Sequence, residues 1–454
     1  MIPLSPSDQL FLWLEKRQQP MHVGGLQLFS FPEDAPDDYV TRLAQQLRRH
    51  HQVSSPFNRR LDSRLGQPVW VQDPHPDLDY HVRIEALPAP GQARELHDFI
   101  AIEHSRLLDR DRPLWECHLI EGLGERRFAL YVKVHHALMD GVSAMAMFRN
   151  MLSTDASRRN MPPVWNLPAR SPGDKEQAVS GSLWHSITQL LDISGTQLGT
   201  LPAVARELLN TINNARHSQD YGSLFRAPKS ILNRKITGSR RFAARSYDLA
   251  RIRRIGQAFD TTVNDVVLAM SAGALRTCLM NRDALPEQSL VAMVPVSLRH
   301  GGSAEGNQVG VLLASLGTHL GDPAQRLMHI HQDISRGKER YRKMSPDAII
   351  NYTALMLAPA AFHLLTGMAP GWQTFNVVIS NVPGPVSNCY WNGAQLQSMY
   401  PVSIAMDQLG LNMTLTSYHN QIEFGLIGCS RVLPELQSLL DYLEDSLAEL
   451  EQAL

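Results

Sequence analysis

The residues best suited to chemistry stand together in the heptapeptide HHALMDG at positions 135–141. Two adjacent histidines could share a metal ion only if their rings converged, but neighbouring side chains of a strand point to opposite faces. No HExxH helix or Cys/His set accompanies them in the sequence. We therefore expect no metal here. The alternative is a single general base, because imidazole exchanges protons near neutral pH.

The preceding segment RFALYVKVHH (127–136) indicates which histidine would act. Its alternation places His136 at the end of the apolar face, where desolvation keeps an imidazole neutral, and places His135 on the other face with Lys133. A histidine that only satisfies a core position would fit the same pattern. Asp140 and Gly141 also have a plain interpretation, as the N-cap and first residue of the next helix.

These residues need elements to position them. Residues 114–122 and 127–136 are β-rich runs separated by a short glycine-containing turn, which predicts an antiparallel hairpin. Helices are predicted at about 93–108, after Gly141 and at 261–279, with a strand at 290–298 and a second hairpin at about 411–428. Residues 153–182 have the composition of a linker, about 183–216 are expected to be helical, and leucines spaced 4-3-4-3-4 predict a closing helix.

Composition limits the class of protein. The 454 residues carry 43 Lys and Arg against 44 Asp and Glu, so we expect no nucleic-acid partner that depends on overall charge. The four cysteines are scattered, which favours a reducing compartment. The N-terminal segment does not resemble a signal peptide, and no purely apolar run is long enough to span a bilayer. We expect a cytoplasmic protein or one on a membrane surface.

The segment from Ala348 to Met406 contains no Asp, Glu, Lys or Arg. Charges avoid positions that water cannot reach, so this segment is either ordinary core or the wall of an apolar channel. Within it, ALMLAPAAFHLLTGMA (354–369) is the candidate wall, because small residues leave room that large ones line. Leu355, Ala360 and Gly367 are the residues that we expect to line such a channel.

HHALMDG is also the HHxxxDG signature of the CoA-dependent acyltransferase superfamily. Further segments narrow the resemblance: PLWE at 113–116, Asn264-Asp265, PVSLR at 295–299 and SNVPGP at 380–385. With these motifs in order, the chain resembles the bacterial wax ester synthase/diacylglycerol acyltransferase family from its first residues to its last helix.

The resemblance implies an α/β (α+β) protein with two chloramphenicol-acetyltransferase-like domains. Each would have a mixed β-sheet flanked by helices, and a helical linker would join them with an active-site tunnel at their interface. On the sequence, this places an N-terminal domain with the HHxxxDG motif at 1–152, the linker at 153–230 and a C-terminal domain at 231–454.

The implied reaction transfers an acyl group from long-chain acyl-CoA to a fatty alcohol or to diacylglycerol, with acyl-CoA as co-substrate and no cofactor. By position, His136 is the general base and the alcohol attacks the thioester directly, without an acyl-enzyme. That agrees with a chain that has no GxSxG elbow or candidate cysteine nucleophile. Asn264, expected at a helix start, is the candidate oxyanion donor, although a helix-start residue without a chemical role is the alternative.

The other motif residues receive supporting roles from the resemblance. Asp140 and Arg299 are expected to form an ion pair between the two halves, and His135, Gly141 and Asp265 to support the site. Pocket shaping is expected of Pro113, Leu114 and Trp115, and Ser380 and Asn381 begin a loop (380–385) that we expect to cross between domains.

Residues 226–254 are strongly basic. Such a run is usually a solvated face, but Arg234, Lys235, Arg240 and Arg241 could instead bind CoA phosphates or anionic lipid headgroups. A place at the inner membrane or on lipid inclusions would fit the second interpretation. Two other functions stay open: a condensation-type acyltransferase that uses a carrier-protein thioester, and a non-catalytic lipid carrier or lipid-droplet protein.

Overall fold

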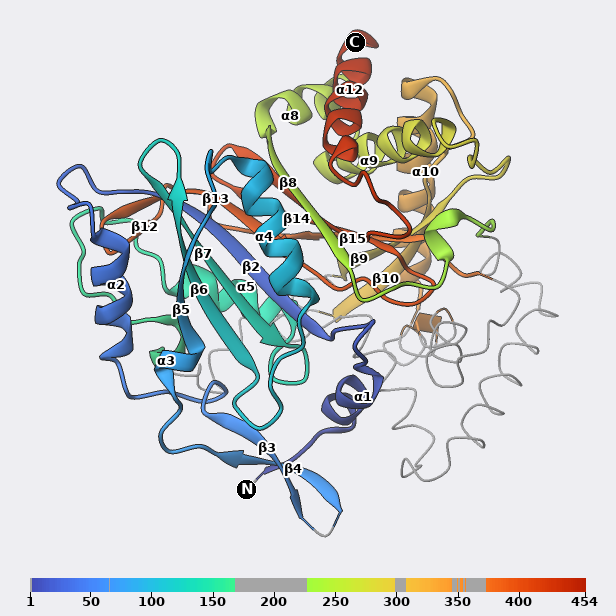
Figure 1. Ribbon diagram of the computed structural model, residues 1–454. Helices are drawn as coiled ribbons and strands as arrows, with labels where there is room; N and C mark the ends of the chain where they lie inside the picture. Colours follow the sequence, from blue (N-terminus) through green and yellow to red (C-terminus); the bar gives the residue numbers. More distant parts are fainter. Residues whose placement is uncertain are drawn as a thin grey trace.

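The structure, a computed structural model, describes residues 2–64, 66–167, 227–298, 308–344, 349, 352–353, 356 and 373–454. Arg299, Leu355, Ala360, Gly367 and the helical segment expected at 183–216 lie outside these residues. The described chain is organised around two six-stranded sheets (Figure 1).

The first sheet carries the histidine motif. Its order is β12-β13-β2-β7-β6-β5, and only β5 and β6 run parallel. The predicted hairpin at 114–136 is confirmed as β6 and β7. The strands are β2 (His22–Ser30), β5 (Val82–Ala86), β6 (Trp115–Leu123), β7 (Arg127–His135), β12 (Tyr390–Trp391) and β13 (Ala394–Val402).

The second sheet has the order β10-β9-β11-β14-β15-β8. It is mixed, because β11 runs parallel to both β9 and β14 while the other pairs are antiparallel. The strands are β8 (Arg240–Asp248), β9 (Val291–Leu298), β10 (Gln308–Ser315), β11 (Val377–Val382), β14 (Leu411–Tyr418) and β15 (Gln421–Cys429). A small third sheet joins β1 (Ile2–Pro3), β4 (Gln67–Gln72) and β3 (Arg59–Arg64).

Helices cover the outer faces of both large sheets (Figure 1). The predicted helices at 93–108 and after Gly141 are confirmed as α4 and α5. The closing helix is confirmed as α12, which packs against α9 and buries the leucines at 440, 443, 447 and 450, whereas Leu454 is exposed. The described helices are α1 (Pro6–Leu14), α2 (Tyr39–Arg48), α3 (Leu78–His81), α4 (Ala93–Ser105), α5 (Gly141–Asn150), α8 (Leu249–Ala258), α9 (Val263–Met280), α10 (Pro323–Arg342) and α12 (Ser438–Gln452), with 3-10 turns at Val164–Asn166 and Ile231–Asn233.

Helix α9 is the one described helix that is long and apolar enough to cross a membrane by length and composition. Most of it is buried, and it packs against α8, α10 and α12. Such surroundings are those of a core helix, whose apolar character all round reflects burial on all sides.

The chain passes between the two sheets in its C-terminal third. Strand β11 of the second sheet ends at Val382, β12 and β13 then complete the first sheet, and β14 returns to the second. Val402 of β13 lies opposite Gly24 of β2. The chain therefore crosses between the sheets after Val382, within the range expected. The expectation that Ser380 and Asn381 begin the crossing loop is wrong, because both are paired residues of β11. The division into domains at 1–152, 153–230 and 231–454 stays a prediction. The first sheet does not respect it, because β12 and β13 come from the range 231–454.

Candidate active site

The two histidines stand where β7 ends. Leu130, Val132 and Val134 of this strand join the main hydrophobic core, whereas Tyr131 joins a second cluster on the other face. The predicted alternation of the strand is thus confirmed. The backbone N–H of His136 donates to the carbonyl of Met21 at 2.8 Å, which fixes the chain just beyond the strand.

His136 lies in an apolar setting but keeps 9% of its surface exposed. Its imidazole stacks on the ring of Phe11 in α1, with centroids 4.1 Å apart and 25° between the planes. Burial lowers the pKa of His136 to about 4, although the nearby carboxylate of Asp140 opposes the shift; His135 adds to it. The ring is therefore neutral at physiological pH, which is the state that a general base requires.

His135 has different surroundings, because its side chain is fully buried. The backbone N–H of Ala137 donates to its Nδ1 at 3.0 Å, and its Nε2 lies 3.3 Å from Oε1 of Glu15. Burial by itself would raise the pKa of Glu15, but His135, the Met21 N–H and Arg110 together hold that pKa below its usual value. His135 is thus part of a buried polar chain, and His136 is the less completely buried of the two, at 9% exposure against none.

Asp140 and Gly141 begin α5. Asp140 is its N-cap and accepts the Ser143 N–H at 2.7 Å, so the N-cap interpretation is confirmed. A methyl group added at Gly141 would meet nothing within 4 Å. The expected ion pair between Asp140 and Arg299 stays a prediction, since Arg299 lies outside the described residues.

Asn264 and Asp265 lie in the first turn of α9, behind the N-cap Thr262. Asp265 is buried and accepts hydrogen bonds from the Thr262 N–H at 2.9 Å and the Thr262 hydroxyl at 2.8 Å. His331 of α10 approaches its carboxylate at 2.9 Å. These contacts fix the start of the helix and so the place of the half-buried Asn264, whose role as oxyanion donor stays a prediction.

The PLW motif packs behind the strands. Leu114 and Trp115 are fully buried, and Leu114 accepts the backbone N–H of His135 at 3.0 Å. The Trp115 ring stacks between His81 and Trp165, and its Nε1 donates to the carbonyl of Phe57 at 2.8 Å. Both side chains are thus core residues, and the expectation that they shape the pocket stays a prediction.

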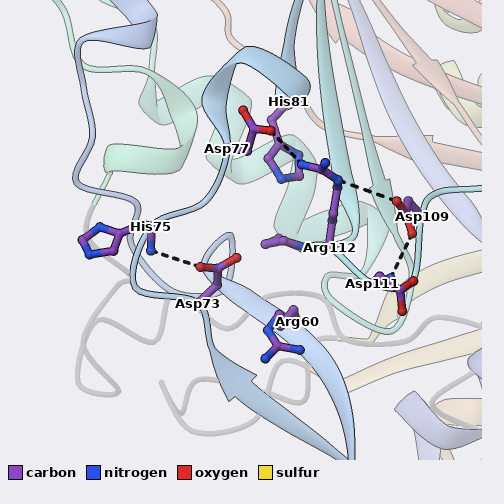
Figure 2. A pocket seen from close by; sticks show the side chains of 9 residues that line it. Arg60, Asp73, His75, Asp77, His81, Asp109, Asp111 and Arg112 are labelled. Atoms are coloured by element: carbon purple, nitrogen blue, oxygen red, sulfur yellow. Dashed lines mark hydrogen bonds and ion pairs between the residues drawn. The ribbon is translucent and has the colours of Figure 1, made fainter.

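Pro113 of the same motif borders a cavity of about 470 Å³ on the outer side of the protein (Figure 2). The lining is polar, and Arg112 joins Asp77 at 2.9 Å and Asp109 at 3.7 Å across it. His81 also borders this cavity, with Nδ1 bonded to the carbonyl of Trp115. The lining has four carboxylates and two arginines, and such a charged surface does not suit an acyl chain. The other lining residues are Arg60, Asp73, His75 and Asp111.

A larger hollow of about 960 Å³ follows β10 and α10. Val311 and Leu313 supply apolar walls, and Arg336 and Arg340 lie at its border. Tyr352, also on the lining, comes shortly before the segment 354–369 in the sequence. Of these two cavities of the described residues, the second has the larger volume and the more apolar lining. The channel wall expected at 354–369 itself lies outside them, apart from Met356, and stays a prediction.

Ser380 and Asn381 lie on β11, opposite Thr414 and Leu415 of β14. Both are half-buried, so they stand at the edge of the interior and not in its core. Their contribution to a substrate pocket stays a prediction.

The four basic candidates divide into two kinds. Arg234 and Lys235 are exposed and Arg241 is half-buried, 3.7 Å from Asp98. Arg240 is only 5% exposed, and its guanidinium donates to the carbonyls of Thr237 and Gln18. The expectation that Arg240 binds phosphate is therefore wrong. Its buried guanidinium instead connects segments of the chain through hydrogen bonds from Nη1 and Nη2 to backbone carbonyls.

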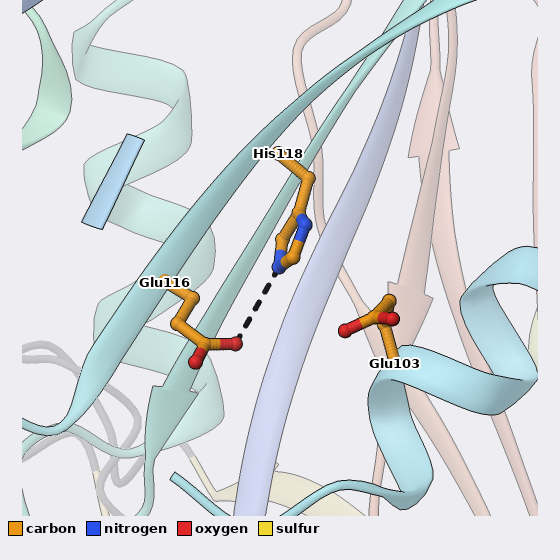
Figure 3. A group of neighbouring side chains, drawn as sticks. All are labelled: Glu103, Glu116 and His118. Carbon is orange, nitrogen blue, oxygen red and sulfur yellow. Dashed lines mark ion pairs between the residues drawn. The ribbon is translucent and has the colours of Figure 1, made fainter. Parts of the chain in front are cut away.

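Glu103, Glu116 and His118 bring ligand atoms within 4.8 Å of one another on the covered face of the first sheet (Figure 3). Lys133 lies in the same group, with Nζ 3.0 Å from Glu116 Oε2 and 3.0 Å from the Glu103 carbonyl oxygen. Burial alone would raise the pKa of Glu116, but His118 and Lys133 lower it to about 2. The ammonium group already supplies the cation, so we interpret the group as a buried ion pair.

The arrangement of the two sheets defines the fold class of the protein. The first condensation domain of the calcium-dependent antibiotic synthetase has the same fold, with a TM-score of 0.56 at 15% identity over 99% of this chain and 96% of that domain. The two sheets are therefore the pair found in condensation and chloramphenicol-acetyltransferase-like proteins.

The particular family follows from closer matches. The model of the wax ester synthase/diacylglycerol acyltransferase catalytic domain matches residues 4–267, and that of the WS/DGAT C-terminal domain matches residues 305–451. The chain belongs to this family.

Similar proteins agree over the full length. "O-acyltransferase WSD" of Acinetobacter baylyi is 44% identical, over 98% of this chain and 96% of its own. "Probable diacyglycerol O-acyltransferase tgs2" of Mycobacterium tuberculosis is 41% identical over 99% of both. The solved structure of a wax ester synthase/diacylglycerol acyltransferase from Marinobacter aquaeolei is 61% identical with a TM-score of 0.86, covering 100% of this chain and 99% of that one.

Sequence reasoning missed Phe11, Glu15 and Met21. The available signal was an acid, Glu15, in the otherwise apolar segment FLWLE, since a charge among buried residues needs a partner. Nothing local identified His135 as that partner.

Proposed function

We propose that the protein is an acyl-CoA-dependent O-acyltransferase that esterifies long-chain fatty alcohols to wax esters and diacylglycerol to triacylglycerol. The observation that carries the chemistry is the neutral, partly open imidazole of His136, held between Phe11 and the backbone of Met21. Family membership and the names of the full-length relatives supply the substrate class.

In the proposed mechanism, the imidazole of His136 removes the hydroxyl proton of the alcohol as its oxygen attacks the thioester carbonyl. The tetrahedral intermediate carries a negative oxygen, for which the amide of Asn264 is the proposed donor. Collapse breaks the carbon–sulfur bond, and the CoA thiolate takes the proton back from His136. The residues thus end as they began, and no cofactor is needed.

Direct attack is favoured over an acyl-enzyme. The four cysteines are buried. Burial raises the pKa of Cys117 to about 12 and also raises the pKa values of Cys278 and Cys389, so these three thiols supply little thiolate, which is the nucleophilic form. Burial would raise the pKa of Cys429 as well, but its hydrogen bonds with Thr237 lower it, and those bonds already engage its sulfur. A condensation-type reaction with a carrier-protein thioester has fold likeness alone behind it, at 12–17% identity.

The test is thiol release from palmitoyl-CoA in the presence of hexadecanol. We expect His136→Ala to lower the turnover by about 10²–10⁴-fold, which is the usual contribution of a positioned general base. His51→Ala, which changes an exposed histidine, is the matched control and should keep wild-type turnover. A non-catalytic lipid carrier would show no turnover in any variant, and His136→Ala at the wild-type rate would exclude this mechanism.

We further propose a cytoplasmic protein that associates peripherally with the inner membrane or with lipid inclusions. The support is a surface beside α1 where Trp13 is 41% exposed and Leu107 is 42% exposed. Arg110 joins the loop after α4 to the Leu12 carbonyl, so these residues are neighbours. Lys16 and Arg17 are exposed next to Trp13. Aromatic and basic side chains together suit an anionic lipid surface.

Vesicle sedimentation tests this surface, with phosphatidylglycerol-containing and pure phosphatidylcholine vesicles. We expect binding to the anionic vesicles, and Trp13→Ser should weaken it. Met280→Ser removes an equally exposed apolar side chain at the end of α9 and should bind normally. Equal binding by both variants would refute the assignment of this surface.

A further inference from the structure

Helix α1 and the turn after it hold the catalytic histidine from several sides. Phe11 stacks on the His136 imidazole, and the Met21 carbonyl accepts the His136 N–H. Glu15, at the end of α1, accepts the Met21 N–H at 3.2 Å through Oε1. Met21 is therefore bonded on one side to Glu15 and on the other to His136.

The same carboxylate oxygen of Glu15 approaches the neighbouring ring. Since the Ala137 N–H donates to Nδ1 of His135, that nitrogen carries the lone pair and the neutral ring carries its proton on Nε2. Nε2 lies 3.3 Å from Oε1 of Glu15. The negative charge of the carboxylate lies beside this nitrogen, and the electrostatic attraction favours the tautomer of His135 with the proton on Nε2.

Arg110 holds the other oxygen of Glu15. Its Nη2 and Nε lie 3.0 and 3.2 Å from Oε2, and Nη2 also donates to the Leu12 carbonyl at 2.7 Å. The side chain of Glu15 is only 2% exposed, so this counter-ion offsets a charge that would otherwise be costly to bury. Both oxygens of the carboxylate are in use.

We propose that Glu15 is a positioning residue for acyl transfer, which sets the tautomer of His135 and the backbone of Met21 and so keeps the His136 imidazole in one orientation against Phe11. This inference rests on the proposed function. Glu15 does not touch the substrates; it acts through the two histidines. A displacement of about 1 Å at a base can cost on the order of 10²-fold in rate.

In Glu15→Gln alone, the new amide N–H₂ could face the guanidinium of Arg110, which is also a donor. The test therefore changes Glu15 and Arg110 together. Glu15→Gln with Arg110→Gln keeps an acceptor oxygen for Met21 and His135. Glu15→Leu with Arg110→Met is equally free of charge but has no acceptor. Neither pair leaves an unpaired charge, so both are expected to fold, but the Leu/Met protein should melt lower because the buried Met21 N–H loses its acceptor. Both proteins are therefore assayed well below their melting temperatures.

With palmitoyl-CoA and hexadecanol, we expect the Gln/Gln protein to keep kcat within about threefold of wild type. Well below its melting temperature, the Leu/Met protein should lose kcat by about tenfold to a hundredfold at nearly unchanged KM. Asp8→Asn, which removes a carboxylate at the other end of α1, should leave kcat unchanged. Equal kcat in the two double variants would overturn the inference.

A second readout needs no substrate. Carbethoxylation of His136 by diethyl pyrocarbonate, followed by peptide mass spectrometry, should be faster in the Leu/Met protein, because its ring is held less tightly. Equal rates in the two proteins would again overturn the proposal. If the wild-type protein released no thiol, the proposed function would be contradicted instead. The carbethoxylation rates would still test whether Glu15 positions His136.

Discussion

The carboxyl group of Glu423 is buried between the two large sheets. It lies on β15, opposite Ser246 of β8, whose hydroxyl contacts Oε2 at 2.5 Å. Tyr400 of β13, in the other sheet, reaches the same Ser246 hydroxyl at 2.9 Å. Burial raises the pKa of Glu423 from 4.5 to about 8, so the folded protein keeps this side chain neutral at physiological pH. We expect Glu423→Gln to stabilise the protein, and more so as the pH rises.

The sign and size follow from proton linkage. Between pH 4.5 and about 8 the unfolded chain releases the Glu423 proton while the folded chain retains it, so the wild-type protein loses stability as the pH rises through this window. Each pH unit corresponds to 1.36 kcal/mol, which gives about 3–5 kcal/mol over the whole window. Glutamine has no proton to retain. The advantage of Glu423→Gln should thus be small at pH 5 and reach about 3–5 kcal/mol at pH 8.

Urea unfolding followed by tryptophan fluorescence, at pH 5 and pH 8, measures the difference. Glu451→Gln is the matched control with the opposite sign, because the hydrogen bond from Arg251 holds the pKa of Glu451 below its usual value. That variant should lose stability relative to wild type at pH 8. If the advantage of Glu423→Gln is no larger at pH 8 than at pH 5, the carboxyl is ionised in the fold and the reasoning fails.

Three further changes test the site. Asn264→Ala should lower kcat by about 10²–10³-fold, as removal of an oxyanion donor does, and wild-type kcat would leave Asn264 as a helix-start residue. Gly141→Ala should melt at or slightly above the wild-type temperature, since its methyl group meets no neighbour; a clear fall in melting temperature would contradict this. Phenylalanine at Ala360 or Gly367 should shift the product esters, measured by gas chromatography, toward shorter alcohols. Unchanged chain length in folded variants would favour ordinary core at 354–369.

The sequence predicted the elements that depend on local pattern. Alternation along 127–136 is a property of neighbouring residues, so it correctly gave the strand β7 and the separate faces of His135 and His136. The N-cap role of Asp140 could be predicted for the same reason. Family motifs then supplied the two-sheet fold, which no local pattern contains.

Contacts between distant segments could not be predicted from the local sequence pattern. Glu15 meets His135 across 120 positions of chain, and β13 joins β2 across more than 360. Composition also misled: Arg240 belongs to a basic run that reads as surface, yet carbonyl oxygens from several segments fully occupy its guanidinium. The stacking partners of Trp115 likewise show a core position, which its motif did not indicate.

The turn that holds His136 is itself held by the second half of the chain. Gln18 accepts a hydrogen bond from Arg240 at 2.8 Å, and Gln19 Oε1 accepts the Asp407 N–H at 2.9 Å. Asp407 lies in the connection that returns the chain from β13 to β14. Because Met21 follows directly and binds both Glu15 and His136, the position of the base depends on how the two sheets are joined. In the proposed mechanism, the exchange of β12 and β13 between the halves therefore contributes to the chemistry, since it helps to fix the position from which His136 would meet both substrates.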